Sequence, residues 1–462
     1  MILGGDRERT LGAALAIGRA IGPSRIVDDP DMLARFARDE SEEPAHVPAA
    51  AVIPHTASEA AACLRIAAER GVPVTPRAGG TGKSGGAVPV MGGIVLACDH
   101  MARIKEIHEG DLVAVVEPGV VLARLHEAVE DMGLFYPPDP ASLDSCCMGG
   151  NVAENAGGPR AFKYGVTSHY VLRLEVATTS GAILRVGHRP VKGVAGYNLA
   201  EMLVGSEGTL GFFTEITLRL IPRPDRVSTA MALYADVSRA GQGIGAVLAA
   251  GLVPRVLEIM DRESVDTVRE AGAPLPRGAG ALVLAEFDGS ERAVEADLEK
   301  AAEALDRAGA TDVLAATGAA ERGRLWKARR DLSEALRRRR AHKTADDIAV
   351  PRSRLVEALE RIEMIASRHG LVGATYGHAG DGNLHVNFLW DDPDLAAAAA
   401  RARAETLQLA IDLDGTISGE HGIGSVSREF LEKEIGRDVM ELCRGLKRLL
   451  DPSGILNPGK IF

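Results

Sequence analysis

The sequence predicts an α+β protein, and three features of its pattern support that class. In the first half, amphipathic helix patterns alternate with short apolar runs of strand length. Two prolines, at positions 222 and 224, then interrupt this pattern. Beyond them, strand-like runs accompany longer helix patterns. Because 462 residues are too many for one ordinary core, we expect two or three domains.

The first third of the chain predicts two helices and three strands. Residues 58–71 predict an amphipathic helix with a serine at its start and a glycine at its end. Residues 72–76 predict a short strand that leads directly into a glycine-rich loop. Residues 93–98 and 112–119 are apolar runs with the length of buried strands, and residues 121–133 predict a second helix that ends at a glycine.

The later elements are a hairpin, further strands and longer helices. Residues 171–186 predict the hairpin, with Thr-Thr-Ser-Gly as its turn, and residues 208–220 predict the last strand before the prolines. Residues 282–289 predict a strand, and residues 290–309 and 394–413 predict helices. We therefore expect an N-terminal domain over 1–222, a second domain over 223–415 and a C-terminal segment, 416–462, that returns to the first domain.

Composition and charge exclude some classes of protein. The net charge of −11 argues against a general nucleic-acid binder. Residues 322–343 carry ten basic side chains, which favour either a solvated helix face or a surface for an anionic membrane or an acidic partner. No apolar run approaches the roughly 20 residues that cross a bilayer, and five cysteines without a signal-peptide pattern indicate a reducing compartment. We expect a cytoplasmic protein, or one peripheral to the inner membrane face.

The stretch "PRAGGTGKSGGAVP", residues 76–89, contains Gly-Thr-Gly-Lys-Ser, as the end of an ATPase P-loop does. A P-loop requires a glycine five residues before Gly82, where this chain has Arg77. It also requires a helix from Lys83 onward, and the "GGAVPVMGG" that follows cannot continue one. Spacing and context therefore both argue against an ATPase.

The same loop nevertheless has the chemistry to bind a diphosphate. Consecutive glycines let backbone N–H groups converge on an anion, and Thr81 and Ser84 add hydroxyl donors. Two more glycine-rich stretches follow, at residues 146–167 and 203–211. One such loop could be only a tight turn, but three of them favour a large, elongated ligand such as a dinucleotide.

The order of "PRAGGTGKSGG", "PPDPASLDSCCMGGNVAENAGG", "KYG" and "GSEGTLG" resembles the FAD-binding domain of the vanillyl-alcohol oxidase and p-cresol methylhydroxylase flavoproteins. The chain is most similar to the branch that contains the glycolate oxidase flavin subunit, D-lactate dehydrogenase and D-2-hydroxyglutarate dehydrogenase. The resemblance implies a two-part FAD-binding domain and a ferredoxin-like α+β substrate (cap) domain. It also implies these FAD-binding residues: Arg77, Gly79, Gly80, Thr81, Gly82, Lys83, Ser84, Pro138, Asp139, Ser142, Gly149, Gly150, Asn151, Asn155, Gly157, Tyr164, Gly165, Gly205, Glu207, Gly208, Gly211 and Asn457.

Two positions in the first loop depart from common patterns of this family. Relatives that bind flavin covalently often carry a histidine where this chain has Thr81, so we expect FAD to be bound non-covalently. Lys83 stands where many relatives have an apolar residue, and both a phosphate contact and a solvent-facing side chain are consistent with it.

A second motif, "YGHAGDGNLHVNF", places His378 and His385 on either side of a Gly-Asp-Gly-Asn turn. Such a turn can bring both imidazoles to one side, although histidines near a turn also occur without a metal. The later stretch "SGEHGIG" adds Glu420 and His421. Two histidines and one carboxylate with open positions suit zinc, manganese or iron. Asp381 is the alternative carboxylate, although in such a turn it more often caps its own backbone.

Both stretches closely resemble the D-2-hydroxyacid branch, and the resemblance implies specific roles. His378, His385 and Glu420 would be the metal ligands, His421 the catalytic base, and Asn387 a neighbour of the substrate. Oxidation of a 2-hydroxy acid removes the hydroxyl proton and transfers the Cα hydride to flavin N5. A metal on the hydroxyl oxygen and a histidine that titrates near neutrality both suit that chemistry.

The substrate carboxylate requires a cation, and "LWKARRDLSEAL" resembles the family's Trp-x-x-Arg helix. This likeness implies that Arg329 binds the carboxylate, since a guanidinium can form two hydrogen bonds to it. An ordinary position on the basic helix face is the alternative. The 2-hydroxyglutarate enzymes have a lysine where the nearest alignment places Ala345, so a small monocarboxylate is favoured.

We therefore expect an FAD-dependent, divalent-metal-assisted dehydrogenase of a small D-2-hydroxy acid, either D-lactate or glycolate. D-2-hydroxyglutarate dehydrogenase and a partner-dependent flavin subunit of a multi-subunit glycolate oxidase are the alternatives. Arg329 and the metal motif disfavour an oxidase of alcohols or sugars that lack a carboxylate. A quinone, a cytochrome, an electron-transfer flavoprotein and an iron–sulfur subunit are all candidate electron acceptors.

Overall fold

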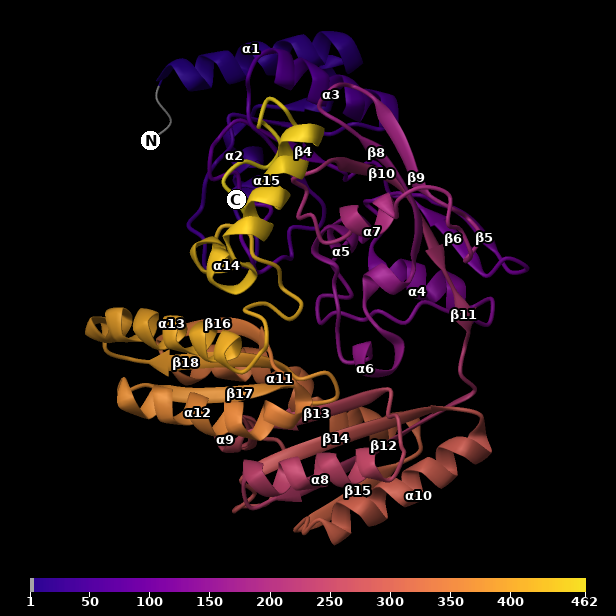
Figure 1. Cartoon of the computed structure of the whole chain (residues 1–462), viewed down its shortest axis with the longest axis vertical. Coiled ribbons are helices and arrows are strands. Elements are labelled where there is room, and N and C mark those ends of the chain that lie inside the picture. The colour runs from indigo at the N-terminus through magenta and orange to yellow at the C-terminus, as the bar shows by residue number, and fades with distance from the viewer. Residues whose placement is uncertain (1–3) are drawn as a thin grey trace. The chain divides into compact units, whose positions relative to one another are not determined.

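Figure 1 shows a computed structural model of the chain, which describes residues 4–462. The first three residues of the predicted 1–222 domain lie outside the described residues. The chain forms two compact units: the first comprises residues 4–157, 166–223 and 420–462, and the second comprises residues 158–165 and 224–419. Both units mix helices and strands, as the sequence predicts. The predicted domain limits at 222 and 415 stay a prediction.

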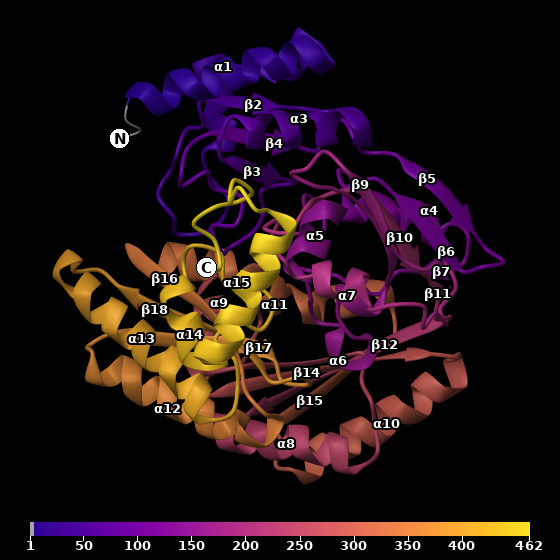
Figure 2. The same ribbon diagram turned by 45° about the horizontal axis from the view of Figure 1, so that its top comes forward.

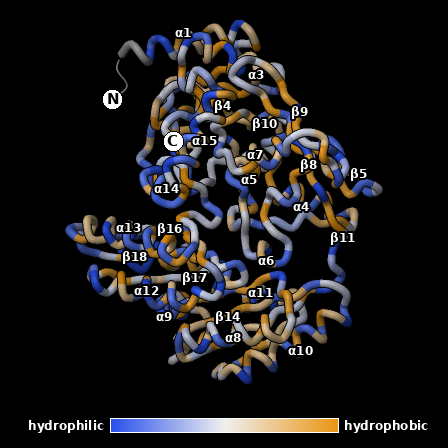
Figure 3. Tube along the Cα trace, in the orientation of Figure 1, coloured by the Kyte–Doolittle hydropathy of each residue, from blue (hydrophilic) through white to orange (hydrophobic). Residues whose placement is uncertain are grey.

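The first unit contains these elements: α1 (Gly4–Ile21), β1 (Ile26–Val27), α2 (Pro30–Leu33), β2 (Ala50–Val52), α3 (Ala57–Glu69), β3 (Val74–Arg77), β4 (Ile94–Ala97), β5 (Ile104–His108), β6 (Val113–Val116), α4 (Leu122–Glu130), β7 (Leu134–Phe135), α5 (Met148–Glu154), β8 (Val171–Ala177), β9 (Ile183–Gly187), α7 (Leu199–Leu203), β10 (Phe212–Arg219), β11 (Ile221–Pro222), α14 (Arg428–Ile435) and α15 (Arg437–Leu450). They form a four-stranded sheet in the order β1-β2-β4-β3, a five-stranded sheet in the order β5-β6-β10-β8-β9, and the pair β11-β7. In Figure 3 α14 is largely hydrophilic, whereas hydrophobic and hydrophilic colours alternate along β8.

The predicted elements of this unit form, with shifts of a few residues at their ends. Helix α3 begins one residue earlier than expected, because Thr56 and not Ser58 is its cap: the Thr56 hydroxyl accepts a hydrogen bond from the Glu59 backbone N–H at 3.2 Å. The predicted hairpin is confirmed, since β8 and β9 pair in antiparallel fashion.

The C-terminal segment is bound to the first unit through backbone hydrogen bonds to β3. The Val74 N–H donates to the Ile455 carbonyl at 2.7 Å, and the Asn457 N–H donates to the Val74 carbonyl at 2.7 Å. Leu456 thereby bridges Val74 in parallel, as an additional strand residue would. Ile455 and Leu456 are also buried in the same apolar core as α1, α3 and β4.

The second unit contains these elements: α6 (Ala161–Tyr164), β12 (Arg226–Tyr234), α8 (Val237–Ala249), β13 (Val256–Met260), α9 (Arg262–Glu270), β14 (Ala281–Gly289), α10 (Glu291–Arg307), β15 (Asp312–Ala316), α11 (Ala319–Arg339), β16 (His342–Ala349), α12 (Leu355–Arg368), β17 (Val372–His378), β18 (Asn383–Trp390) and α13 (Ala396–Asp412). One antiparallel sheet joins its strands in the order β15-β12-β14-β13-β17-β18-β16. The β15-β12-β14-β13 part has the strand order and the connections of a ferredoxin-like fold, with α9 added between β13 and β14. The ferredoxin-like prediction is therefore confirmed.

The two faces of this sheet differ. Helices α8, α10, α12 and α13 pack along one face (Figure 2). On the other face, α9 and α11 cover an apolar half that includes Met260, Leu284, Leu332 and Tyr376. The strand register places Glu258, His378, His385, Asp347 and Asn383 on that same second face, where Glu258 and His385 border the apolar half. The sheet therefore presents one half-face that is polar.

Several side chains of the basic run at 322–343 form ion pairs within the second unit. Arg338 pairs with Glu334, Arg339 with Glu263, and Arg340 with Asp391. This pairing favours the solvated helix face over a docking surface for an anionic partner. Among residues 4–462, no helix has both the length and the apolar character that are needed to span a bilayer.

The buried Lys460 predicts a pH dependence of stability. Its side chain is 2 % exposed and donates to the Val88 carbonyl. Burial lowers the pKa of Lys460 to about 8, although Glu43 and Asp39 act in the opposite direction. Between this value and the ordinary lysine pKa the unfolded chain binds more protons, so the free energy of unfolding should rise with pH, by up to about 3 kcal/mol.

Lys460→Met should lack this dependence. We expect the variant to be more stable than the wild type at pH 7.5 and to lose most of that advantage by pH 10, as measured by denaturant unfolding at both values. If the free energy of unfolding changed equally with pH in the wild type and in Lys460→Met, the prediction would be contradicted.

Candidate active site

In the first unit, the three glycine-rich loops that the sequence analysis assigns to FAD are tied together. The Asn457 amide donates to the backbone carbonyls of Gly86 at 3.0 Å and of Glu207 at 2.7 Å, which joins the first loop to the third. The second loop packs on the first at Gly79, where an added Cβ would lie 2.7 Å from the Ser145 carbonyl oxygen. The loops are thus held close enough to contact one elongated ligand.

These loops also contain buried polar atoms without partners. Asn457 Oδ1, Ser206 Oγ and Asn151 Nδ2 are buried and have no hydrogen-bond partner among residues 4–462. A buried polar atom that stays unsatisfied costs about 1–3 kcal/mol. The hydroxyl, phosphate and ring atoms of a flavin dinucleotide provide both donors and acceptors, so these residues fit FAD.

Glu207 anchors the segment that carries Glu420 and His421. Its carboxylate accepts hydrogen bonds from the backbone N–H groups of Ile423 at 2.7 Å and Gly424 at 2.6 Å. Burial raises the pKa of Glu207 to about 7, and these two hydrogen bonds oppose that rise. Within the same unit, an added Cβ at Gly157 would lie 2.9 Å from Glu420 Oε2. The predicted flavin loops and the predicted base are therefore parts of one unit.

Two of the predicted FAD residues lie in the second unit. The Tyr164 hydroxyl donates to Asp288 at 2.9 Å, and its neighbour Lys163 also binds Asp288. Gly165 ends α6 with φ 80°, a value that favours glycine. Pro138, Asp139, Ser142 and the other predicted FAD residues lie in the first unit.

In the second unit, a buried carboxylate binds the first predicted metal ligand. Glu258 of β13 has no exposed surface, and its Oε1 lies within hydrogen-bond distance of His378 Nδ1. Because a carboxylate only accepts, Nδ1 donates this hydrogen bond, and in the neutral imidazole Nε2 then carries the lone pair. Glu258 Oε2 accepts from Arg329 Nε. Burial alone would raise the pKa of Glu258, but His378 and Arg329 outweigh burial and leave it below the ordinary value.

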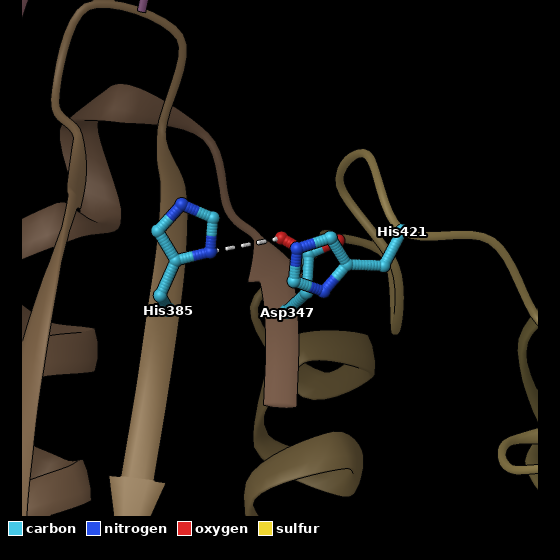
Figure 4. A group of neighbouring side chains, drawn as sticks. All are labelled: Asp347, His385 and His421. Carbon is cyan, nitrogen blue, oxygen red and sulfur yellow. Dashed lines mark ion pairs between the residues drawn. The ribbon is translucent and has the colours of Figure 1, made fainter. Parts of the chain in front are cut away.

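The second predicted metal ligand also lies beside a buried carboxylate, but at ion-pair distance and, among residues 4–462, without a hydrogen bond from its Nδ1. His385 Nδ1 lies 3.5 Å from Asp347 Oδ1, and Figure 4 shows this ion pair. The Asn383 amide donates to the same Asp347 oxygen at 2.6 Å. The Asp347 carbonyl accepts from the Gly419 N–H at 3.2 Å, and Glu420 and His421, the latter also drawn in Figure 4, follow Gly419 directly in the chain.

The histidines belong to a closed ring of five side chains, which we call the five-residue ring. Arg329 binds Glu258, Glu258 binds His378, and the imidazoles of His378 and His385 meet edge to face with centroids 5.2 Å apart. Tyr376 lies 5.2 Å from His385, and the Arg329 guanidinium lies 4.5 Å from the centre of the Tyr376 ring. The predicted turn therefore does bring both histidines to one side.

The structure also shows the contacts of three further residues that the sequence analysis considered: Arg329, Asn387 and Asp381. Arg329 points inward to the five-residue ring, which excludes the alternative of an ordinary basic surface residue. Asn387 is buried, and its amide donates to the backbone carbonyls of Ala374 and His385, so it also supports β18. Asp381 accepts from the Asn383 N–H at 3.3 Å and thus caps its own turn.

Sequence analysis missed Glu258 and Asp347. The signal was present, since each is an acidic residue inside a run of buried strand residues. A carboxylate in such a position requires a partner, but the partner could not be identified without the strand register.

Comparisons with known proteins agree with these observations. Residues 48–187 match the family model described as FAD binding domain, and residues 223–461 match the model described as FAD linked oxidases, C-terminal domain. The chain is 39% identical over 444 residues to glycolate oxidase subunit GlcD of Bacillus subtilis, with 96% of this chain and 94% of the relative covered. It is 38% identical over 416 residues to D-lactate dehydrogenase of Archaeoglobus fulgidus, with 89% and 90% covered.

Solved structures show the same fold. The chain superposes on p-cresol methylhydroxylase with a TM-score of 0.79 at 17% identity, over 100% of this chain and 97% of that one. It also superposes on 4-ethylphenol oxidase from Gulosibacter chungangensis with a TM-score of 0.79 at 21% identity, over 98% and 97% of the two chains.

The close packing at Gly79 predicts a defect in flavin binding. In Gly79→Ala the new methyl group would force the first loop away from the Ser145 carbonyl. We expect FAD affinity to fall by roughly tenfold or more, which corresponds to about 1.4 kcal/mol. The measurement is the flavin absorbance per chain after dialysis.

Gly245→Ala in α8 is the matched control, because a Cβ there meets nothing within 4 Å. It should retain the wild-type flavin content. Equal flavin content in the two variants would contradict the prediction.

Proposed function

The chain belongs to the FAD-linked oxidases, and on that basis we propose that it oxidises a small D-2-hydroxy acid, D-lactate or glycolate, to the 2-oxo acid with help from a divalent metal ion. Its membership makes it an FAD-linked oxidoreductase. The substrate class is supported by relatives that are named glycolate oxidase subunit and D-lactate dehydrogenase.

The observation that carries the metal part of the proposal is the pairing of both imidazoles with carboxylates. Nδ1 of His378 donates to Glu258, and Nδ1 of His385 lies at ion-pair distance from Asp347, so Nε2 of each neutral ring is the proposed ligand atom. Metal-binding histidines usually make such a bond with their other nitrogen. Ligand atoms of His378 and His385 also lie within 4.8 Å of one another. These donors fit zinc, manganese or iron.

Glu420 is the proposed third ligand and His421 the proposed base. They are one and two residues beyond Gly419, whose N–H donates to the Asp347 carbonyl. Their Cα atoms therefore lie within about 3.8 and 7.6 Å of the Gly419 Cα. A divalent ion, when bound, would lower the pKa of the substrate hydroxyl. His421 would take the hydroxyl proton, and Arg329 would hold the substrate carboxylate through its guanidinium.

FAD, when bound, supplies the acceptor for the hydride that leaves the substrate Cα. The predicted residues of the three glycine-rich loops would hold it without a covalent bond, since Thr81 has no nucleophilic ring nitrogen. The electrons must then leave for a second acceptor. We propose a separate carrier, because the five described cysteines form no set of four ligands for an iron–sulfur cluster. A quinone, a cytochrome, an electron-transfer flavoprotein or a partner iron–sulfur subunit would all serve.

The preference for a monocarboxylate is supported by Ala345. The register pairs Ala345 with Asn387 on the polar half-face, two residues from Asp347. A methyl group there offers no cation to a second carboxylate. Lys343 lies on the same face but two residues further along β16, so we favour D-lactate or glycolate over D-2-hydroxyglutarate.

The proposal predicts the outcome of anaerobic flavin titrations. We expect D-lactate or glycolate, but neither L-lactate nor D-2-hydroxyglutarate, to bleach the visible absorption band of the oxidised flavin. Treatment with a chelator should prevent bleaching, and added Mn²⁺ or Zn²⁺ should restore it. A flavin that none of these acids reduces, with metal present, would refute the substrate assignment and favour a flavin subunit that requires a partner.

A gain-of-function variant tests the role of position 345. Ala345→Lys places an ammonium group beside Asn387, and a charge-assisted hydrogen bond to a second carboxylate contributes about 1.5–3 kcal/mol. We expect kcat/KM for D-2-hydroxyglutarate, relative to D-lactate, to rise by at least about tenfold. Ala345→Met, which adds length without charge, is the control and should not shift this ratio.

A further inference from the structure

Glu258 is a charged group in a strand that is otherwise apolar. All five residues of β13 are buried, and the Glu258 side chain has no exposed surface. Removing an ion from water costs several kcal/mol unless other groups compensate for the lost hydration. A glutamate at this position therefore needs partners that are specific in both charge and geometry.

The partners of Glu258 come from two other elements. One oxygen binds His378 at the end of β17, and the other binds Arg329 on α11. Each partner is thus held by a different oxygen of one rigid, planar carboxylate. A rotation of that carboxylate would move the imidazole and the guanidinium together.

We propose that Glu258 is a positioning residue that orients both His378 and Arg329, and so couples binding of the metal ion to binding of the substrate carboxylate. This inference rests on the proposed function, in which His378 is a metal ligand and Arg329 grips the substrate. It adds a residue that contacts neither ligand yet sets the geometry of both binding groups.

The five-residue ring supports such coupling. Arg329 reaches His378 by two routes, directly through Glu258 and also through Tyr376 and His385. Side chains in one packed network respond to one another, whereas distant residues act independently. A change at Arg329 should therefore alter metal affinity even though arginine is not a metal ligand.

A second buried carboxylate on the same sheet face provides the matched control. Glu286 of β14 binds Arg255, Trp326 and Thr229, none of which we assign to metal or substrate. Glu258 and Glu286 are thus equivalent in burial and in having an arginine partner. They differ in that Glu258 alone of the two binds His378.

The test compares Glu258→Gln with Glu286→Gln in the flavin-loaded, metal-stripped full-length protein. Gln keeps the shape of Glu, but its NH₂ group would face one of the two N–H donors. We expect Mn²⁺ affinity, measured by calorimetry without substrate, to fall by 10- to 100-fold in Glu258→Gln. KM for the hydroxy acid should rise by about tenfold or more. Glu286→Gln should lower the melting temperature about as much as Glu258→Gln does. Its Mn²⁺ dissociation constant and its KM for the hydroxy acid should stay within about twofold of the wild-type values.

A third variant tests the coupling if Glu258→Gln does not fold. Arg329→Lys removes the Nε–H that binds Glu258 and should weaken Mn²⁺ binding several-fold, whereas Arg255→Lys should not. Rescue is expected in Glu258→Asp, which keeps the charge and should recover part of the Mn²⁺ affinity.

The outcomes separate this inference from the proposed function. If the wild type binds Mn²⁺ and is reduced by a hydroxy acid, but the variants at 258 and 286 behave alike in Mn²⁺ affinity and KM, Glu258 is only a structural residue. If the wild type neither binds Mn²⁺ nor is reduced by any of the acids, the proposed function itself is wrong, and the role of Glu258 is refuted with it.

Discussion

A carboxylate that is buried in a sheet must find a partner for its charge, and this requirement organises the second unit. Glu258, Glu286 and Asp347 all lie on one face of the sheet, and each is satisfied by side chains from other elements. Helices α9 and α11 cover the apolar part of that face, and α11 also supplies partners for two of the carboxylates, Arg329 for Glu258 and Trp326 for Glu286. Strand alternation places these carboxylates on that face of the strands, and residues of α11 and of neighbouring strands satisfy them.

In the same sheet, successive side chains of one strand point to opposite faces, so neighbouring residues have different partners. Asp346 and Asp347 are adjacent in β16, but Asp346 pairs with Arg403 of α13 on the covered face, and Asp347 holds His385 on the polar face. Two identical residue types therefore stabilise the packing of a helix and orient a proposed metal ligand, respectively. The side of the sheet decides the role, because the side-chain chemistry is the same.

Local features of the fold were predictable from the sequence, because their causes are local. Helix α3, the hairpin β8–β9 and the turn between His378 and His385 are encoded by residues within a few positions of one another. The bond of Glu258 to His378 spans 120 positions, and its bond to Arg329 spans 71. Such pairs follow from register and helix placement, which no short pattern encodes. The packing of Tyr164 against Asp288, 124 positions away, was hidden for the same reason.

The hydrogen bonds of the Asn457 amide to Gly86 and Glu207 have a consequence for the order in which the chain can fold. Asn457 closes the first glycine-rich loop from 371 positions away, after the whole of residues 224–419 has been synthesised. On the ribosome, the largest part of the second unit is a continuous stretch that has emerged before Asn457 is made. Most of the second unit is therefore complete in the chain while the first unit still lacks residues 420–462. The contact that joins the first and third glycine-rich loops can therefore form only after nearly the whole chain has been made.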